Sequence, residues 1–399
     1  MAHHYIPFAN SVTDWRLVNS LYPQAAGCRI TLQSVKKAGT EKLPSPKLWV
    51  DAEVDGLRSP EVFTSDDESY RAYKQYILQF ENSRMIADPQ FQADPDRTDA
   101  AVFVNAVLKA AVDAVPNLAW LSVPQLPYTA DLGTKRINKM LAELTSQWKS
   151  AKRRPVQLIL PVIFDKQRGQ TDKKADRDKR VRQAVACFRA SGADGVWIVD
   201  SMLDDQAGVS TFENERFPGI IKFHEELTAE LPKEAKTVAG PYWGLNLVLW
   251  ARGAVRCPAV GVGRSYRYYV AGRQPKSAKS RVALAPLKRL AVWSPALKTW
   301  LRETLADLSR NDPVYGDFAT LLKKFDVFQT KERARQQVAE FYRDWLDKLE
   351  SVPASSTALT LYQDFSSAFV LGKKLKRPIP SEDVKDPARI AKQLMVNCL

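Results

Sequence analysis

Histidine is scarce in this chain, which has only three histidines among 399 residues. His3 and His4 lie next to the N-terminus and His224 lies inside a predicted helix, so no His-Glu-x-x-His or other metal-binding spacing exists. The Walker phosphate loop and the Gly-x-Ser-x-Gly nucleophile motif are also missing. We therefore expect no metal and no other cofactor.

Cysteine and long apolar runs are scarce as well. The four cysteines are scattered and none has Cys-x-x-Cys spacing, so neither a zinc knuckle nor a disulfide framework is predicted. No run of about 18 apolar residues is present, and the N-terminus lacks the basic start and apolar core of a signal peptide, so we expect no membrane contact. A reducing cytoplasm fits these features best.

Positive charge is abundant and unevenly distributed. Residues 1–120 hold 12 Lys and Arg against 15 Asp and Glu, whereas the remainder holds 47 against 30, a net charge of +17. Such asymmetry is typical of a polyanion-binding face, and a merely soluble basic surface is the alternative. We expect a nucleic acid or a nucleotide as partner. The basic stretch 165–182 supplies the predicted contact residues Lys173, Lys174, Lys179 and Arg180.

Short runs rich in Val, Ile, Leu and Trp alternate with helical stretches along the first 290 residues. The predicted strands are 28–35, 48–52, 84–87, 118–123, 156–164, 195–199, 237–240 and 259–263. Continuous apolar runs are typical of parallel strands buried on both faces, so this order predicts an α/β fold, a (β/α)8 TIM-like barrel over residues 1–290. Residues 36–47 contain Gly39, Pro44 and Pro46 and cannot form a crossover helix, so we expect an irregular first unit or an N-terminal hairpin arm.

The pattern after the barrel is wholly helical, which predicts a C-terminal helical region over residues 291–399 that packs on the barrel. Helices are expected at 294–309, 330–350 and 382–396. One apolar stripe predicts a contact with the barrel, or alternatively with a partner protein; it consists of Val338, Phe341, Tyr342, Trp345 and Leu349.

Acidic residues follow several of the predicted strands, at the barrel end where TIM-barrel active sites lie. Asp51 and Glu53 are two residues apart and would share one face of a strand, and Asp88 and Asp200 follow two further strands. Crowded carboxylates raise the pKa of at least one of them, which suits acid–base or nucleophilic chemistry. The alternative is that these acids cap the following helices.

The last two predicted strands end in glycine turns, where TIM barrels often bind phosphate. Glycines let backbone amides approach an anion, and a neighbouring arginine adds a bidentate donor. The predicted phosphate or nucleic-acid site consists of Gly240, Gly261, Gly263, Arg264 and Tyr266. Tight turns that merely end the strands would have the same glycines.

Two segments carry a resemblance to a known family. Trp49-Val50-Asp51 is followed by Gly56, and Met85-Ile86-Ala87-Asp88 follows. With them, residues 48–270 resemble the tRNA-guanine transglycosylase family of barrels and their DNA-acting relatives. The resemblance implies attack of an aspartate on a nucleoside C1′, with exchange or removal of the base. The family's Asp-Ser-Gly-Gly-Phe signature and its Cys/His zinc cluster are absent, so its nucleophile is not assigned to a position here.

Three functions fit these observations. The first is an enzyme, a transferase or hydrolase, that acts on a nucleotide or nucleic acid by glycosidic or phosphate-ester chemistry. The second is a non-catalytic barrel that binds nucleic acid or a protein partner within a larger complex, such as an antiviral defence system. The third is a phosphosugar enzyme with an incidental basic surface. Crowding of the acids at one end of the barrel favours the first.

Overall fold

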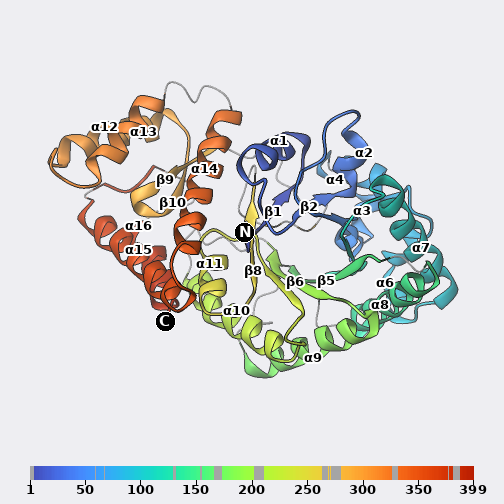
Figure 1. The fold of residues 1–399 in the computed structure, drawn as a ribbon. Coiled ribbons are helices and arrows are strands. Elements are labelled where there is room, and N and C mark those ends of the chain that lie inside the picture. The colour runs from blue at the N-terminus through green and yellow to red at the C-terminus, as the bar shows by residue number, and fades with distance from the viewer. Residues whose placement is uncertain are drawn as a thin grey trace.

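Eight parallel strands form a closed barrel surrounded by helices, which confirms the predicted (β/α)8 fold (Figure 1). The computed structural model describes residues 4–58, 60–66, 68–128, 132–152, 155–165, 173–201, 211–262, 268, 270, 280–325, 331–375, 377–380 and 387–399. The strands are β1 (Ile6–Ala9), β2 (Cys28–Thr31), β3 (Leu48–Asp51), β4 (Trp120–Ser122), β5 (Gln157–Asp165), β6 (Gly195–Ser201), β7 (Lys236–Ala239) and β8 (Cys257–Gly261). Pairing of Ile6 with Ala259 closes the barrel between β1 and β8.

The first strand of the barrel was not predicted. Ile6-Pro7-Phe8-Ala9 is only four residues long and contains a proline, so it lacks the length and composition of an interior strand. The predicted first strand, 28–35, is β2 only as far as Thr31, whose side chain then caps α2 (Leu32–Lys37) by accepting from the amide of Ser34. Because β2 pairs in parallel with both β1 and β3, the hairpin-arm alternative is wrong.

The predicted strand 84–87 is wrong, since these residues belong to the helical connection between β3 and β4. Arg84, Met85 and Ala87 are helix formers, and only one side of this turn is buried. The connection between β2 and β3 has no helix over residues 38–47, as expected, and the connection between β3 and β4 is irregular as well. This connection contains η1 (Val54–Arg58), α3 (Glu61–Thr64), α4 (Glu68–Ile77), α5 (Ser83–Ile86), α6 (Pro89–Ala93) and α7 (Arg97–Ala114).

The other barrel helices follow ordinary rules of helix formation. They are α1 (Val12–Leu21), α8 (Leu132–Lys152), α9 (Lys174–Ser191), α10 (Thr211–Ala229) and α11 (Leu245–Ala251). The Ser11 side chain caps α1 by accepting from the amide of Asp14, and Gly192 ends α9 with φ of +59°. Inside the barrel, Phe8, Trp49 and Trp197 pack edge to face with ring centroids 5.3–5.5 Å apart. The barrel is thus filled by side chains and is not a channel.

The C-terminal region begins with a β-hairpin that the sequence did not reveal. In it β9 (Arg281–Leu284) pairs antiparallel with β10 (Arg289–Val292) around η2 (Ala285–Leu287), so the predicted boundary at residue 290 falls inside β10. The helices that follow are α12 (Pro295–Asp307), α13 (Tyr315–Phe325), α14 (Lys331–Glu350), α15 (Ala354–Lys374) and α16 (Pro387–Val396). The hairpin, α12 and α13 share a small apolar core of their own around Leu297, Trp300 and Phe318.

Helix α14 joins this region to the barrel, as its apolar stripe predicted. The Tyr342 and Trp345 rings lie 5.1 and 6.3 Å from the Trp243 ring, which follows β7. The Tyr342 hydroxyl donates to Oδ1 of Asn246 at 2.7 Å. In Figure 1 the orange and red C-terminal elements lie on one side of the barrel, with α14 and α11 between the two.

Candidate active site

A buried arginine lies at the centre of the candidate site. Arg29 on β2 is fully buried, and its Nε donates to Oδ2 of Asp51 at 2.9 Å. Its Nη2 also donates to that oxygen, and its Nη1 donates to Oδ1 of Asn10 at 2.9 Å. Parallel pairing of β2 with β3 explains this contact, because the register places Arg29 two residues before the partner of Asp51.

Aromatic rings surround the guanidinium group of Arg29. Its central carbon lies 5.0 Å from the Phe8 ring, 4.9 Å from the Trp197 ring and 5.8 Å from the Tyr268 ring. Such contacts stabilise a cation that has lost its water. Burial alone would lower the pKa of Arg29, but Asp51, Tyr268 and Glu53 hold that pKa above its usual range. Arg29 is therefore a permanent buried cation.

Glu53 is the second carboxyl group beside this cation. Its Oε1 lies 3.7 Å from Nη2 of Arg29, and its backbone amide donates to Oδ1 of Asp51 at 3.1 Å. The expectation that Asp51 and Glu53 share a strand face is wrong, because β3 ends at Asp51 and Glu53 has a left-handed φ of +52°. A turn, and not strand alternation, brings them together.

The surroundings of Glu53 change its ionisation. The pKa of Glu53 is raised to about 8. Burial is the largest cause, and the nearby Asp51 and Asp55 also raise this pKa, while Arg29 and the Thr31 hydroxyl lower it. Glu53 is therefore mostly protonated at neutral pH, next to a carboxylate that is paired with a cation. This division of roles between two neighbouring carboxyl groups is what acid–base chemistry requires.

A third carboxyl group completes what we call the carboxyl cluster, defined as Asp51, Glu53 and Asp55. Asp55 in η1 is buried, and its Oδ2 accepts a hydrogen bond from the Tyr268 hydroxyl at 2.8 Å. Among the described residues, no three His, Cys, Asp or Glu side chains are arranged to hold a metal ion. The cluster is organised around Arg29 instead.

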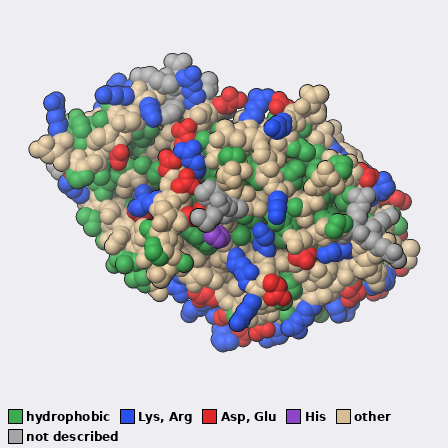
Figure 2. All heavy atoms as spheres, in the orientation of Figure 1, with side chains coloured by type: hydrophobic (Ala, Val, Ile, Leu, Met, Phe, Trp, Pro, Cys, Tyr) green, Lys and Arg blue, Asp and Glu red, His purple; other side chains and the backbone are tan. Residues whose placement is uncertain are grey.

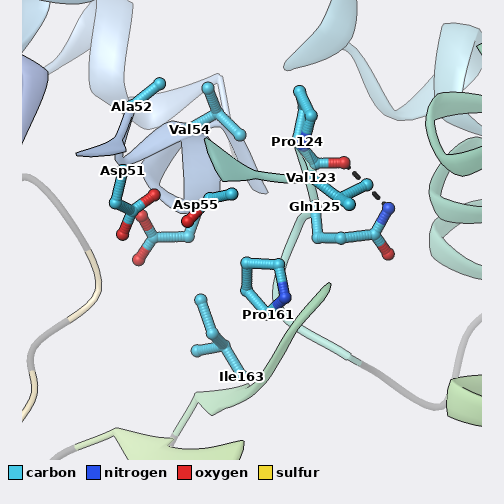
Figure 3. A pocket seen from close by; sticks show the side chains of 10 residues that line it. Asp51, Ala52, Val54, Asp55, Val123, Pro124, Gln125, Pro161 and Ile163 are labelled. Carbon is cyan, nitrogen blue, oxygen red and sulfur yellow. Dashed lines mark hydrogen bonds between the residues drawn. The ribbon is translucent and has the colours of Figure 1, made fainter. Parts of the chain in front are cut away.

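Asp51 and Asp55 of the carboxyl cluster line a small hollow at the C-terminal ends of β3, β4 and β5, and Glu53 lies outside its lining. The hollow has room for about one water molecule, and the empty space around it, open solvent included, is about 220 Å³. Its lining residues are Asp51, Ala52, Val54, Asp55, Ser122, Val123, Pro124, Gln125, Pro161 and Ile163. Figure 3 shows Asp51 and Asp55 on one side of this hollow and the Gln125 amide bonded to the Pro124 carbonyl on the other. The hollow therefore lies at the end of the barrel where the sequence predicted the site.

The two other predicted acids lie elsewhere. Asp88 is exposed and caps α6, since its side chain accepts from the amide of Gln90 at 2.8 Å, so its prediction as a catalytic residue at a strand end is wrong. Asp200 is buried near the end of β6, where its backbone amide donates to the Tyr242 hydroxyl at 2.6 Å. Its catalytic role stays a prediction.

The glycine turns can be described only in part. Gly240 has φ of +92°, its amide donates to the Ile198 carbonyl at 3.0 Å, and its carbonyl accepts from Nε1 of Trp197 at 2.6 Å. The first of these bonds uses the amide that would have bound phosphate. Gly261 ends β8 and pairs with Phe8. The other predicted phosphate ligands, Gly263, Arg264 and Tyr266, lie outside the described residues.

The predicted basic contacts are divided between surface and core. Lys173, Lys174 and Lys179 are exposed at the start of α9, where Lys174 lies 2.8 Å from Asp178 and Lys179 lies 3.9 Å from Asp176. Arg180 is buried on the inner face of α9 and donates to Oε1 of Gln183, so its prediction as a surface contact is wrong. Figure 2 likewise shows basic and acidic side chains interspersed on the visible face.

Arg29 and Asn10 are residues of the candidate site that the sequence reading missed. Arg29 had a readable signal, because a charged residue inside a strand buried on both faces needs a partner. Asp51 on the next strand was the obvious partner. Asn10 had no such signal, because the strand that precedes it was not recognised.

The raised pKa of Glu53 predicts a pH-dependent stability. Between the ordinary pKa of 4.5 and about 8, the folded chain keeps a proton on Glu53 that the unfolded chain releases. The free energy of unfolding contributed by this group is therefore lost as pH rises through this window. Glu53→Gln should match the wild type near pH 5 and exceed its stability by about 1–3 kcal/mol at pH 9.

Urea unfolding at several pH values would measure this difference. Other titrating groups, such as the buried Asp14, are present in both proteins and cancel. Asp88→Asn, a change at an exposed cap that asparagine can also fill, serves as the control. A difference between Glu53→Gln and wild type that stays constant from pH 5 to 9 would contradict the prediction.

Three further observations limit the identity of the protein. No described helix is long and apolar enough to cross a membrane. The four cysteines are buried and unpaired with one another. One of the two segments that carry the transglycosylase resemblance, 85–88, lies at the end of α5 and the cap of α6, so it forms no strand. Comparison of the chain with models of known protein families and with curated proteins finds no match.

Proposed function

We propose that the protein is an enzyme that cleaves or exchanges the glycosidic bond of a nucleotide or nucleic acid, with Glu53 as the proton donor. The observation that carries this proposal is the arrangement around Arg29: Asp51 is bound to the cation, and the Glu53 carboxyl group lies 3.7 Å from it, in surroundings that raise its pKa to about 8. The position at the C-terminal end of the barrel strands supports it, because TIM-barrel active sites lie there.

Glycosidic chemistry fits the carboxyl cluster. Cleavage of such a bond needs an acid that protonates the leaving group and a carboxyl group near the positive charge that develops at C1′. Glu53 supplies the proton, and Asp55, which lines the hollow, supplies the second carboxyl group. Asp51 is a weaker nucleophile than the sequence reading implied, because both of its oxygens accept hydrogen bonds. Its role is to hold Arg29 and the amide of Glu53.

The proposed substrate class follows from charge. Residues 121–399 have a net charge of +17, and Lys173, Lys174 and Lys179 are exposed at the start of α9, the helix that follows β5. Positive side chains near an active site attract a phosphate backbone. Release of free base from nucleosides and from single-stranded DNA and RNA, followed by chromatography, tests the activity directly.

Nucleic-acid binding should depend on the exposed lysines of α9. Changing Lys173, Lys174 and Lys179 to glutamate in one variant should weaken oligonucleotide binding. The salt dependence of the affinity should also become less steep, by the equivalent of about two to three phosphate contacts. Fluorescence anisotropy from low to moderate salt measures both quantities. The control changes Lys323, Lys324 and Lys373 in the C-terminal region, which are equally exposed and alter net charge identically. Equal losses in both variants would show that net charge alone matters, and no binding by the wild type would reject the substrate class.

One observation favours the non-catalytic alternative. Arg29 and Asp51 satisfy each other within the barrel, as a purely structural ion pair would. A barrel that binds nucleic acid or a protein partner without catalysis would then bind oligonucleotides through α9 and release no base. If the wild type binds oligonucleotides but releases no base from any of the substrates named above, the non-catalytic alternative is supported and the enzyme is not.

A further inference from the structure

Two tyrosines of α4 hold the turn that carries Glu53. The Tyr73 hydroxyl donates to the carbonyl of Glu53 at 2.8 Å, and the Tyr76 hydroxyl donates to the carbonyl of Ala52 at 2.7 Å. Both side chains are buried, and their rings lie 6.2 Å apart. One helix therefore supplies two similar donors to two consecutive carbonyls.

Glu53 needs such support because of its backbone. Its φ of +52° lies in the left-handed region, which a residue with a side chain seldom adopts without being held there. Its amide is fixed by Oδ1 of Asp51, and its carbonyl is fixed by Tyr73. Because hydrogen bonds hold both its amide and its carbonyl, the backbone of Glu53 directs its side chain toward Arg29.

We propose that Tyr73 is a positioning residue for Glu53: its hydroxyl, by holding the Glu53 carbonyl, keeps this residue left-handed and its carboxyl group beside Arg29 and Asp51. Tyr73 itself touches no reacting atom. The inference rests on the proposed function only in treating Glu53 as the proton donor. Tyr76 holds the preceding carbonyl and fixes the end of β3, not the Glu53 side chain.

The charged and titratable groups that face Glu53 come from four elements and one further residue. They are Arg29 from β2, Asp51 from β3, Asp55 from η1, Tyr73 and Tyr76 from α4, and Tyr268. Tyr73→Phe changes none of the charges among them. It removes the bond to the Glu53 carbonyl, so that the residue relaxes toward an extended conformation and its carboxyl group gains water.

The test is a titration of the Glu53 carboxyl group in the whole protein by NMR, with ¹³C-labelled glutamate and with Glu53→Gln to assign its signal. In Tyr73→Phe we expect the midpoint to fall from its wild-type value toward the ordinary glutamate value, by about one pH unit or more. Tyr76→Phe is the matched control, because it deletes the same hydroxyl from an equally buried ring on the same helix. Its midpoint should stay within about 0.3 unit of the wild type.

Other outcomes overturn the inference. An unchanged midpoint in Tyr73→Phe, an equal shift in Tyr76→Phe, or an ordinary midpoint in the wild type would each do so. If Tyr73→Phe does not fold, 4-aminophenylalanine at position 73 keeps a donor at the same place, and a shifted midpoint there would reject the proposal. The titration uses no substrate, so a result that rejects the positioning role of Tyr73 says nothing about whether the protein releases base. Full base release by Glu53→Gln, with the expected shift in Tyr73→Phe, would reject Glu53 as the proton donor and keep the positioning role.

Discussion

Replacing Arg29 with methionine is expected to lower the free energy of unfolding by about 3–5 kcal/mol, because it leaves Asp51 as an unpaired charge in the barrel. Arg29 is fully buried and gives Asp51 two hydrogen bonds from its guanidinium group. Methionine fills similar space between Phe8 and Trp197, so the loss of packing should contribute less to the destabilisation than the loss of the charge. Urea unfolding at pH 7 measures the loss.

A double variant separates charge from packing. Asp51→Asn alone should also destabilise the protein, because Arg29 then becomes the unpaired charge. The combination of Arg29→Met with Asp51→Asn removes both charges, so its loss should be smaller than the sum of the two single losses by about 1–3 kcal/mol. Additive losses, or a loss below about 1 kcal/mol for Arg29→Met, would show that the buried ion pair does not stabilise the barrel.

Glu53→Gln is expected to lower the rate of base release by a factor of about 10² to 10⁴, the usual contribution of a positioned general acid. Glutamine has the same shape and cannot donate an acidic proton. In the wild type the rate should fall as pH rises through about 8, because Glu53 then loses its proton. In Glu53→Gln the residual rate should lack this decline.

Glu53 gives a cleaner test of catalysis than Asp51. A loss of activity in Asp51→Asn would mix any chemical role with the broken bond to Arg29, whereas Glu53→Gln removes no hydrogen bond of that ion pair. Asp88→Asn, at the exposed cap of α6, is the control and should leave the rate unchanged. A rate in Glu53→Gln within about threefold of the wild type, with the same pH profile, would assign the proton transfer to another group.

The sequence predicted the barrel because its long central strands have unmistakable apolar runs. Strand β5 reads Gln-Leu-Ile-Leu-Pro-Val-Ile-Phe-Asp, and its neighbour β6 is equally apolar. Strand β1 was not predicted, because four residues that include a proline show too little of the strand pattern. Residues 84–87 were wrongly predicted as a strand, because a short buried helical turn has the same composition as a short strand. Short elements are decided by tertiary packing, which a local pattern does not contain.

The candidate site was predicted in the same partial way. Asp51 was found because it ends a clear strand, and Glu53 was found for an incorrect reason, since its contact with Arg29 depends on a left-handed turn. The Glu53 carbonyl in that turn accepts from Tyr73, which lies 20 residues away along the chain. Strand alternation cannot reveal contacts of this kind. Arg180 was predicted at the surface because of its charge, but it lies buried on the inner face of α9.

Two neighbouring residues after β7 show why the chain should not be cut at residue 290. The Tyr242 hydroxyl accepts from the amide of Asp200 near the end of β6, whereas the ring of Trp243 packs among Phe341, Tyr342 and Trp345 of α14. The apolar side chains of the barrel, α14, α15 and α16 form one continuous core. A fragment without the C-terminal helices would lose part of the interior of the barrel itself. We therefore expect the C-terminal helices to be needed for a stable barrel, so the site is best studied in a chain that keeps them.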